Sequence, residues 1–175
     1  MTVPAWLLAS SCALLLCACA GTPGAGEGRI VRHVPPNAAI ASAVVVPPGY
    51  QLVFHSGVIP SPANPAAPAG SPEYWGDTRT QAMSVLGKIK ESVEGLGLSM
   101  ADVVAMTVFI GADRSRDPHA RMDFAGFMDA YLQFFGEAAG QPNLPARSTV
   151  EVVNLVQPGM LIEIDVTLAT PAPRS

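Results

Sequence analysis

The chain has 175 residues and a formal net charge of −4. This length is sufficient for one domain with a sizeable hydrophobic core. Because the chain is acidic and has no run of Lys or Arg, it lacks the basic patch that is typical of nucleic-acid-binding proteins. The composition therefore argues against a nucleic acid as partner.

Residues 1–19 have the pattern of a bacterial export signal. Residues 4–20 carry no charge, and their short apolar run is followed by small residues, as in a signal peptide rather than a membrane span. The segment Leu16-Cys17-Ala18-Cys19 resembles a lipobox, in which Cys19 becomes the lipidated first residue. No Lys or Arg precedes the apolar run, so cleavage without lipid and a start site elsewhere remain alternatives. The segment predicts an exported protein that is periplasmic or anchored in the membrane as a lipoprotein.

The chain after this segment lacks the residues of several common catalytic centres. It contains no cysteine, which excludes a disulfide framework, a cysteine metal cluster and a catalytic thiol. Its three histidines, at positions 33, 55 and 119, show no metal-ligand spacing, so no metal site is predicted. A serine hydrolase is disfavoured because no Gly-x-Ser-x-Gly motif occurs.

Strands and loops are predicted from residue 20 to residue 75. Residues 20–28 are rich in glycine and are predicted as a flexible tether. Residues 30–34 are predicted as a short strand, and residues 41–46 and 50–56 as a strand pair joined by a Pro-Pro-Gly turn. Residues 59–75 contain five prolines and predict a long loop, either a functional lid or a disordered insertion.

A long amphipathic helix and a buried strand are predicted next. The helix begins at Asp77 or Thr78, with Gln81 as a capping-box partner, and ends at the glycines near residue 95. Its apolar residues recur at helical spacing, which predicts one buried stripe. Residues 103–110 are nearly all apolar and predict a strand that is buried on both sides.

A second helix is predicted to start at Asp117, which would cap it before Pro118, and to end at Gly136. Its apolar stripe is interpreted as ordinary core packing. The stripe consists of Phe124, Phe127, Met128, Tyr131 and Phe135.

The last two predicted strands alternate between polar and apolar residues. The first puts Arg147, Thr149 and Glu151 on one face. The second puts Glu163 and Asp165 opposite a row of Ile, Val and Leu. A Gln-Pro-Gly turn between the strands predicts an antiparallel hairpin, in which one face is core and the other gathers an Arg and several acids.

The predicted order β-β-α-β-α-β-β indicates an α+β fold with two helices on one face of a mixed sheet. The other face of such a sheet either finds a partner or stays polar. One domain is expected over residues 29–170, followed by a disordered tail over residues 171–175.

Several motifs closely resemble the signature of the Rid family of YjgF-type enamine/imine deaminases. These are Pro-Ala-Arg-Ser at residues 145–148, Val-Glu-Val at 150–152, Ile-Glu-Ile-Asp at 162–165, and a hydrophobic strand that ends in Ser56-Gly57. The resemblance implies a chorismate-mutase-like fold. It also implies a homotrimer whose three sheets close into a central barrel, with active sites in the clefts between subunits.

The resemblance also implies a reaction and its residues. The family hydrolyses reactive 2-enamino and 2-imino acids to 2-oxo acids and ammonia without a cofactor. By position, Arg147 corresponds to the residue that binds the substrate carboxylate, and Glu163 to the residue that orients the attacking water. Ser56, Gly57 and Thr149 would line the substrate pocket, with Thr149 where the family frequently has Cys.

These residues also permit other interpretations. Arg147 would be structural if it paired with Glu151 or another acid of the sheet, and Glu163 would be a solvated strand residue. The alternative function is a non-catalytic envelope trimer that binds a small carboxylate ligand or a protein partner. The export signal and the altered pocket residues favour that alternative.

Overall fold

The computed structural model describes residues 28–115 and 117–173. The expected signal peptide with Cys19, and nearly all of the expected tether, lie outside the described residues. Within the described ranges, no helix combines the length and the apolar character that a membrane crossing requires.

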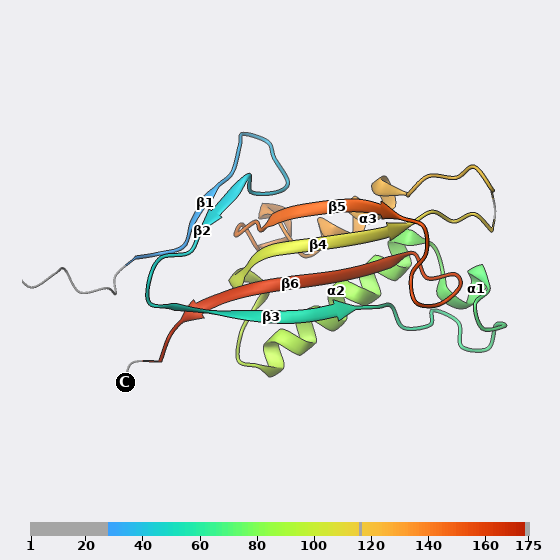
Figure 1. Ribbon diagram of the computed structural model, residues 1–175, viewed down its shortest axis with the longest axis horizontal. Helices are drawn as coiled ribbons and strands as arrows, with labels where there is room; N and C mark the ends of the chain where they lie inside the picture. Colours follow the sequence, from blue (N-terminus) through green and yellow to red (C-terminus); the bar gives the residue numbers. More distant parts are fainter. Residues whose placement is uncertain (1–27, 116, 174–175) are drawn as a thin grey trace, which may run out of the picture.

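A mixed four-stranded sheet forms the centre of the described structure (Figure 1). Its strand order is β3-β6-β4-β5, with β4 and β5 parallel and the other two pairs antiparallel. The strands are β3 (Tyr50–Val58), β6 (Ile162–Pro171), β4 (Val103–Gly111) and β5 (Ala146–Val152). Helices α2 (Thr78–Gly95) and α3 (Phe124–Tyr131) cover one face, which confirms the predicted α+β fold.

Smaller elements surround this sheet. Strands β1 and β2 form a separate two-stranded sheet near the first residues of the described chain (Figure 1). The short elements are β1 (Val31–His33), β2 (Ala43–Val45), α1 (Pro72–Trp75) and the 3-10 helices η1 (Met100–Asp102) and η2 (Glu137–Ala139).

The strand pairing differs from the prediction in two places. Strand β2 pairs with β1 and not with β3, which lies beside β6 instead. Strands β5 and β6 form no hairpin, because β6 lies between β3 and β4. Alternate residues of β6 are buried beneath the helices, so the central position removes its apolar face from water. Strand β5 carries polar residues on that same face and occupies the edge.

The predicted apolar stripe of α2 packs on the sheet and forms the core. Val85, Leu86 and Ile89 are fully buried against helix-facing residues such as Ile110 and Ile164. Burial of each such side chain stabilises the fold by about 1.5–3 kcal/mol. Helix α2 therefore fixes the position of β4 and β6, the two central strands of the sheet.

The cap of α2 is Asp77, whose Oδ1 accepts a hydrogen bond from Thr80 N at 2.8 Å. Gln81 is not a capping-box partner, because its fully buried amide binds a neighbouring turn. Its Nε2 donates to Gly159 O at 3.0 Å, and its Oε1 accepts from Leu161 N at 2.7 Å. These bonds satisfy the buried amide and hold the connection between β5 and β6.

Helix α3 begins later and ends earlier than predicted. Asp123 is its N-cap, with Oδ1 accepting from Gly126 N at 2.8 Å, and the helix ends at Tyr131 rather than Gly136. The N–H of Met122 donates to Glu151 Oε2 at 3.3 Å, which holds the preceding stretch against β5. Asp117, the predicted cap, accepts from the N–H two residues later and closes a turn.

The Pro-rich loop at residues 59–75 is ordered, so the alternative of a disordered insertion is not what the structure shows. The loop ends in α1, whose Trp75 is 4% exposed and donates from Nε1 to Pro158 O at 2.8 Å. The N–H groups of Ala63 and Asn64 both donate to Tyr74 O, at 2.8 and 3.1 Å. The loop is thereby attached to the connection between β5 and β6.

Residues 171–175 are expected to form a disordered tail, but the first two of them are bonded to the sheet. Strand β6 continues to Pro171, which pairs with Tyr50. The N–H of Ala172 donates to Gly49 O at 2.9 Å. The tail expected at residues 171–175 is therefore attached to the sheet at least through residue 172.

The sheet face away from the helices leaves large apolar side chains uncovered in the single chain. Phe54 on β3 is 79% exposed, and Leu52 and Val150 are also exposed. Glu163 and Asp165 of β6 lie on this same face, which we call the bare face. Exposed apolar surface of this kind on a sheet is typical of a protein interface.

Candidate active site

Arg147 lies on the helix-covered side of the edge strand β5. Its position opposite the buried Met106 of β4 directs its side chain toward α3. The guanidinium carbon lies 4.4 Å from the ring centre of Tyr131, 5.0 Å from that of Phe127 and 5.9 Å from that of Phe124. Three aromatic rings of one helix face thus form a cage around this cation, and cation–π attraction holds it there.

The guanidinium in this cage has no oxygen acceptor among the described residues. Its Nη2 donates to the sulfur of Met128 at 3.2 Å, while Nε and Nη1 are buried and without a hydrogen-bond partner there. Burial lowers the pKa of Arg147 from its ordinary value, although the nearby Tyr131 opposes this. A guanidinium prefers paired carboxylate oxygens, and among the described residues this one has buried N–H groups that are free to donate to such a group.

Glu151 is engaged elsewhere, so the alternative of an Arg147–Glu151 pair is wrong. Glu151 Oε2 accepts from Arg121 Nε at 2.7 Å, and Oε1 lies 3.4 Å from Arg114 Nη2. The hydrogen bond from Arg121 is the main cause that holds the pKa of Glu151 below its ordinary value. The acid and the cation share a strand face but belong to different clusters.

Thr149 is the second unsatisfied group beside Arg147. It lies two residues further along β5 on the same face, and its Oγ1 is buried without a hydrogen-bond partner among the described residues. Buried polar groups in folded proteins are nearly always bonded, so each such exception requires an explanation. A ligand that bonds both Arg147 and Thr149 would provide one.

Tyr131 is the cage ring nearest to the guanidinium carbon, and it is itself held in place. Its hydroxyl donates to Ala39 O at 3.0 Å, and burial raises its pKa to about 12, so the ring stays neutral. The segment around Ala39 runs beside the start of β5, where Ala41 N donates to Pro145 O at 3.0 Å. The N-terminal segment thereby fixes the ring on which the guanidinium of Arg147 rests.

Glu163 lies on the bare face of the sheet, opposite Phe109 of β4. Its carboxylate packs on Gly57, where an added Cβ would overlap Oε1 and lie 3.2 Å from Cδ. Ser56 and Gly57 lie in an irregularity of β3, between the pairs His55–Val166 and Val58–Ile164. The structure therefore brings Glu163 together with the predicted pocket residue Gly57, and Ser56 is the next residue along the same irregularity.

The predicted residues thus form two groups on opposite faces of the sheet. Arg147 and Thr149 face the helices, whereas Glu163 faces away from them. The prediction that the last two strands gather the Arg and the acids on one face is wrong, because β5 pairs with β4 instead of with β6. A site that uses both groups requires a second copy of the chain.

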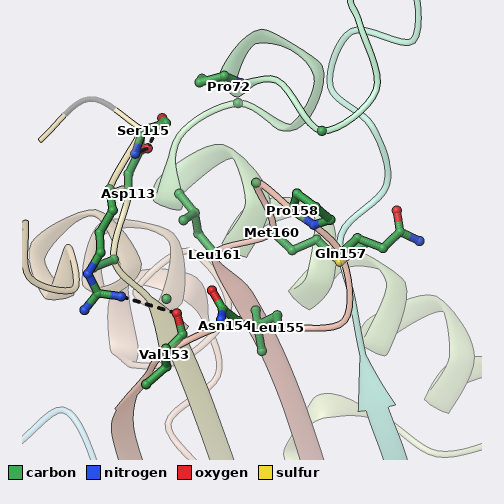
Figure 2. A pocket seen from close by; sticks show the side chains of 16 residues that line it. Pro72, Asp113, Ser115, Val153, Asn154, Leu155, Gln157, Pro158, Met160 and Leu161 are labelled. Carbon is green, nitrogen blue, oxygen red and sulfur yellow. Dashed lines mark hydrogen bonds between the residues drawn. The ribbon is translucent and has the colours of Figure 1, made fainter. Parts of the chain in front are cut away.

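A cavity of about 550 Å³ lies at the C-terminal ends of the parallel strands β4 and β5 (Figure 2). Residues 111–115, 153–155 and 157–161 and parts of the Pro-rich loop line it, and Asp113, Ser115 and Asn154 are among its polar lining residues. Neither Arg147 nor Glu163 lines this cavity. Across the described residues, no cluster of three His, Cys, Asp or Glu side chains is arranged to hold a metal ion.

The mixed sheet with two helices on one face is a chorismate-mutase-like α+β fold. A solved Rid-family structure, YyfB from Yersinia pestis, superposes with a TM-score of 0.59 at 21% identity, covering 81% of this chain and 98% of that chain. Residues 35–170 match the family model described as endoribonuclease L-PSP, and the chain belongs to this family, which includes the Rid, YjgF and RutC proteins.

Three further relatives are similar to this chain. The 2-iminobutanoate/2-iminopropanoate deaminase of Escherichia coli K12 is 35% identical over 105 residues, which are 59% of this chain and 69% of that protein. The structure of Escherichia coli TdcF with bound serine has a TM-score of 0.50 at 30% identity and covers 75% of this chain and 94% of that chain. A RutC family protein of Haemophilus influenzae is 40% identical over 105 residues, 59% of this chain and 68% of its own length.

Sequence reasoning found the polar residues of both groups but missed the cage. It interpreted the aromatic stripe of α3 as core packing, and Phe127, Tyr131 and Phe135 are indeed fully buried. Phe124, however, is 42% exposed and lies over Arg147. Phe124 stands at the start of the stripe and outside the core, and this exposed position was the feature of the sequence that could have indicated the cage.

Proposed function

We propose that the protein hydrolyses reactive 2-enamino and 2-imino acids to 2-oxo acids and ammonia. The observation that carries this proposal is the caged guanidinium of Arg147, whose Nε and Nη1 have no acceptor among the described residues. Membership of a family that includes a 2-iminobutanoate/2-iminopropanoate deaminase supports it. The serine bound in the TdcF structure carries its carboxylate on the carbon that bears nitrogen, as a 2-imino acid does.

In the proposed reaction, Arg147 binds the substrate carboxylate and thereby fixes the position of C2. Charge-assisted hydrogen bonds of this type contribute about 1.5–3 kcal/mol each. Glu163 accepts a proton from water as the oxygen adds to C2 of the C=N bond. This proton then passes to the imine nitrogen, which gives a tetrahedral carbinolamine with a hydroxyl and an amino group on C2. The C2 hydroxyl then gives up its proton, the amino nitrogen gains one, and the C–N bond breaks, so that ammonia leaves as C2=O forms. The imine is already electrophilic, so positioning of the water contributes much of the acceleration.

The proposed site combines two subunits of a homotrimer. Arg147 and Thr149 come from the helix side of one sheet, and Glu163, Ser56 and Gly57 from the bare face of a neighbour. The exposed Phe54 and Val150 on the bare face support an interface at this position. The rigid strands on both sides would hold the two groups in a fixed relation.

We expect the mature domain to have three times the subunit mass in solution, because burial of the bare face stabilises association. Light scattering coupled to size-exclusion chromatography measures this mass. Replacing Phe54 with Glu should shift the protein toward smaller species, since a charge would be buried at the interface. Val153 is similarly exposed but lies beyond the end of β5. Replacing Val153 with Glu is therefore the matched control and should leave the mass unchanged. A wild-type mass of one subunit would contradict the trimer.

We also propose export with a lipid anchor on Cys19. Cys19→Ser should prevent lipidation and move the protein from the membrane fraction to the soluble fraction, because no acyl chain would be attached. Intact-mass measurement and fractionation of cells that express the full chain check this. Cys17→Ser is the matched control and should stay lipidated. Equal processing and membrane association of both variants would contradict the lipobox.

The proposed reaction is tested with 2-aminoacrylate that is generated in the assay, with formation of pyruvate as the readout. Faster pyruvate formation than in buffer supports the deaminase. If the wild-type protein binds pyruvate through Arg147 but does not accelerate the hydrolysis of any imino acid, the proposed deaminase activity is rejected. That result would favour the non-catalytic carboxylate-binding trimer.

A further inference from the structure

Met128 occupies a distinctive position at the Arg147 cage. Its sulfur lies 3.2 Å from Nη2 and is the guanidinium's hydrogen-bond partner among the described residues. Met128 is half-buried and belongs to the same face of α3 as Phe124, Phe127 and Tyr131. It is therefore in direct contact with the group to which a ligand carboxylate would bind.

A thioether is a weak acceptor and has no donor, so a carboxylate would displace it from Nη2. The carbon chain of a 2-oxo or 2-imino acid starts one bond beyond C2, close to the bound carboxylate. It would then lie beside the displaced Met128 and the exposed ring of Phe124. Both groups are apolar, and methionine adapts its shape to a neighbouring chain.

The rest of the cage offers little to a polar side chain of the ligand. The Tyr131 hydroxyl is already donated to Ala39 O. The Thr149 hydroxyl is the available polar group beside Arg147, and it lies on the strand beneath the cation rather than on α3. A hydroxyl, amide or second carboxylate placed against Met128 and Phe124 would lose water without gaining a partner.

We propose that Met128 determines the substrate specificity of this site and selects 2-imino acids with an apolar chain over those with a polar or charged end. This inference rests on the proposed function, since it assumes that Arg147 binds the carboxylate. Met128 acts here as a specificity-determining residue that touches the ligand chain. Each added methylene should improve affinity by up to about fourfold.

The stable 2-oxo acid products allow a direct test by calorimetry on the mature, assembled protein. The probes are pyruvate, 2-oxobutanoate, 2-oxopentanoate and 2-oxoglutarate, the last two being similar in length but different at their ends. Affinity should rise along the first three acids, and 2-oxoglutarate should bind at least about tenfold more weakly than 2-oxopentanoate. Equal affinities for all four acids would overturn the inference.

Two variants separate the role of Met128 from a general packing role. Met128→Gln has a similar length but a polar end, and should reduce the difference between 2-oxopentanoate and 2-oxoglutarate to within about threefold. Met128→Leu keeps an apolar side chain of similar volume and should retain the wild-type order. A Met128→Gln protein that is folded by thermal melting and keeps the wild-type order would overturn the inference.

The same experiment distinguishes the inference from the function on which it rests. If no 2-oxo acid binds the wild-type protein, or if binding survives in Arg147→Ala, the carboxylate site is rejected, and the inference with it. If all acids bind through Arg147 without regard to chain, only the role of Met128 is rejected.

Discussion

Replacing Arg147 with Ala should lower kcat/KM for 2-imino acids by about a hundredfold to ten-thousandfold. The change removes two charge-assisted hydrogen bonds to the carboxylate, each worth about 1.5–3 kcal/mol. Coupled assays with enzymatically generated imino acids measure the loss, and calorimetry with 2-oxobutanoate measures the accompanying loss of binding. The fold should persist, because the buried guanidinium has no oxygen partner among the described residues whose bond would be broken.

Two further variants make this result specific. Arg147→Lys should also be strongly impaired, because an ammonium group lacks the planar fork that binds both carboxylate oxygens. Arg114→Ala is the matched control, since Arg114 belongs to the Glu151 cluster and its guanidinium is exposed. It should retain wild-type kcat/KM. Full activity of Arg147→Ala on all imino acids would contradict the proposed role.

Local patterns predicted the elements of this fold well, whereas pairing between distant strands was beyond them. The helical stripe of α2 and the alternation in β6 are periodic signals within a short window, and both match the buried residues. The turn between β5 and β6 permits either a hairpin or a connection that skips a strand. Only the burial of the whole sheet decides between these, because it places the most apolar strand in the centre.

The candidate site shows the same division between residue type and arrangement. The alternation of β5 correctly placed Arg147 and Thr149 on one face. It did not show that this is the helix face, since the opposite face carries Val150 and also looks like a core. The apolar residues of β5 point to the bare face, which is consistent with an interface there. A periodic pattern cannot distinguish a face buried by helices from a face buried by another subunit.

Replacing Glu163 with Gln should lower kcat by about 10²- to 10⁴-fold while leaving the affinity for 2-oxo acids within about twofold of wild type. Gln keeps the size of the side chain, and therefore its packing on Gly57, but it cannot accept the proton of the attacking water. Single-turnover assays and calorimetry on the same preparation separate the two effects. Asp165→Asn, on the same strand face, is the matched control and should keep most of the activity. A parallel loss of binding and turnover in Glu163→Gln would indicate a role in binding instead.

The opposite faces of Arg147 and Glu163 make a stronger form of this experiment possible. Arg147→Ala and Glu163→Gln subunits are each expected to be inactive as pure trimers. In trimers assembled from an equal mixture, about one interface in four would combine an intact Arg147 with an intact Glu163 from its neighbour, because each contact in a cyclic trimer joins two different surfaces. Activity should therefore return to about a quarter of wild type after the mixture is unfolded and reassembled. Mixed trimers that stay inactive, although light scattering shows that they formed, would contradict a site shared between subunits.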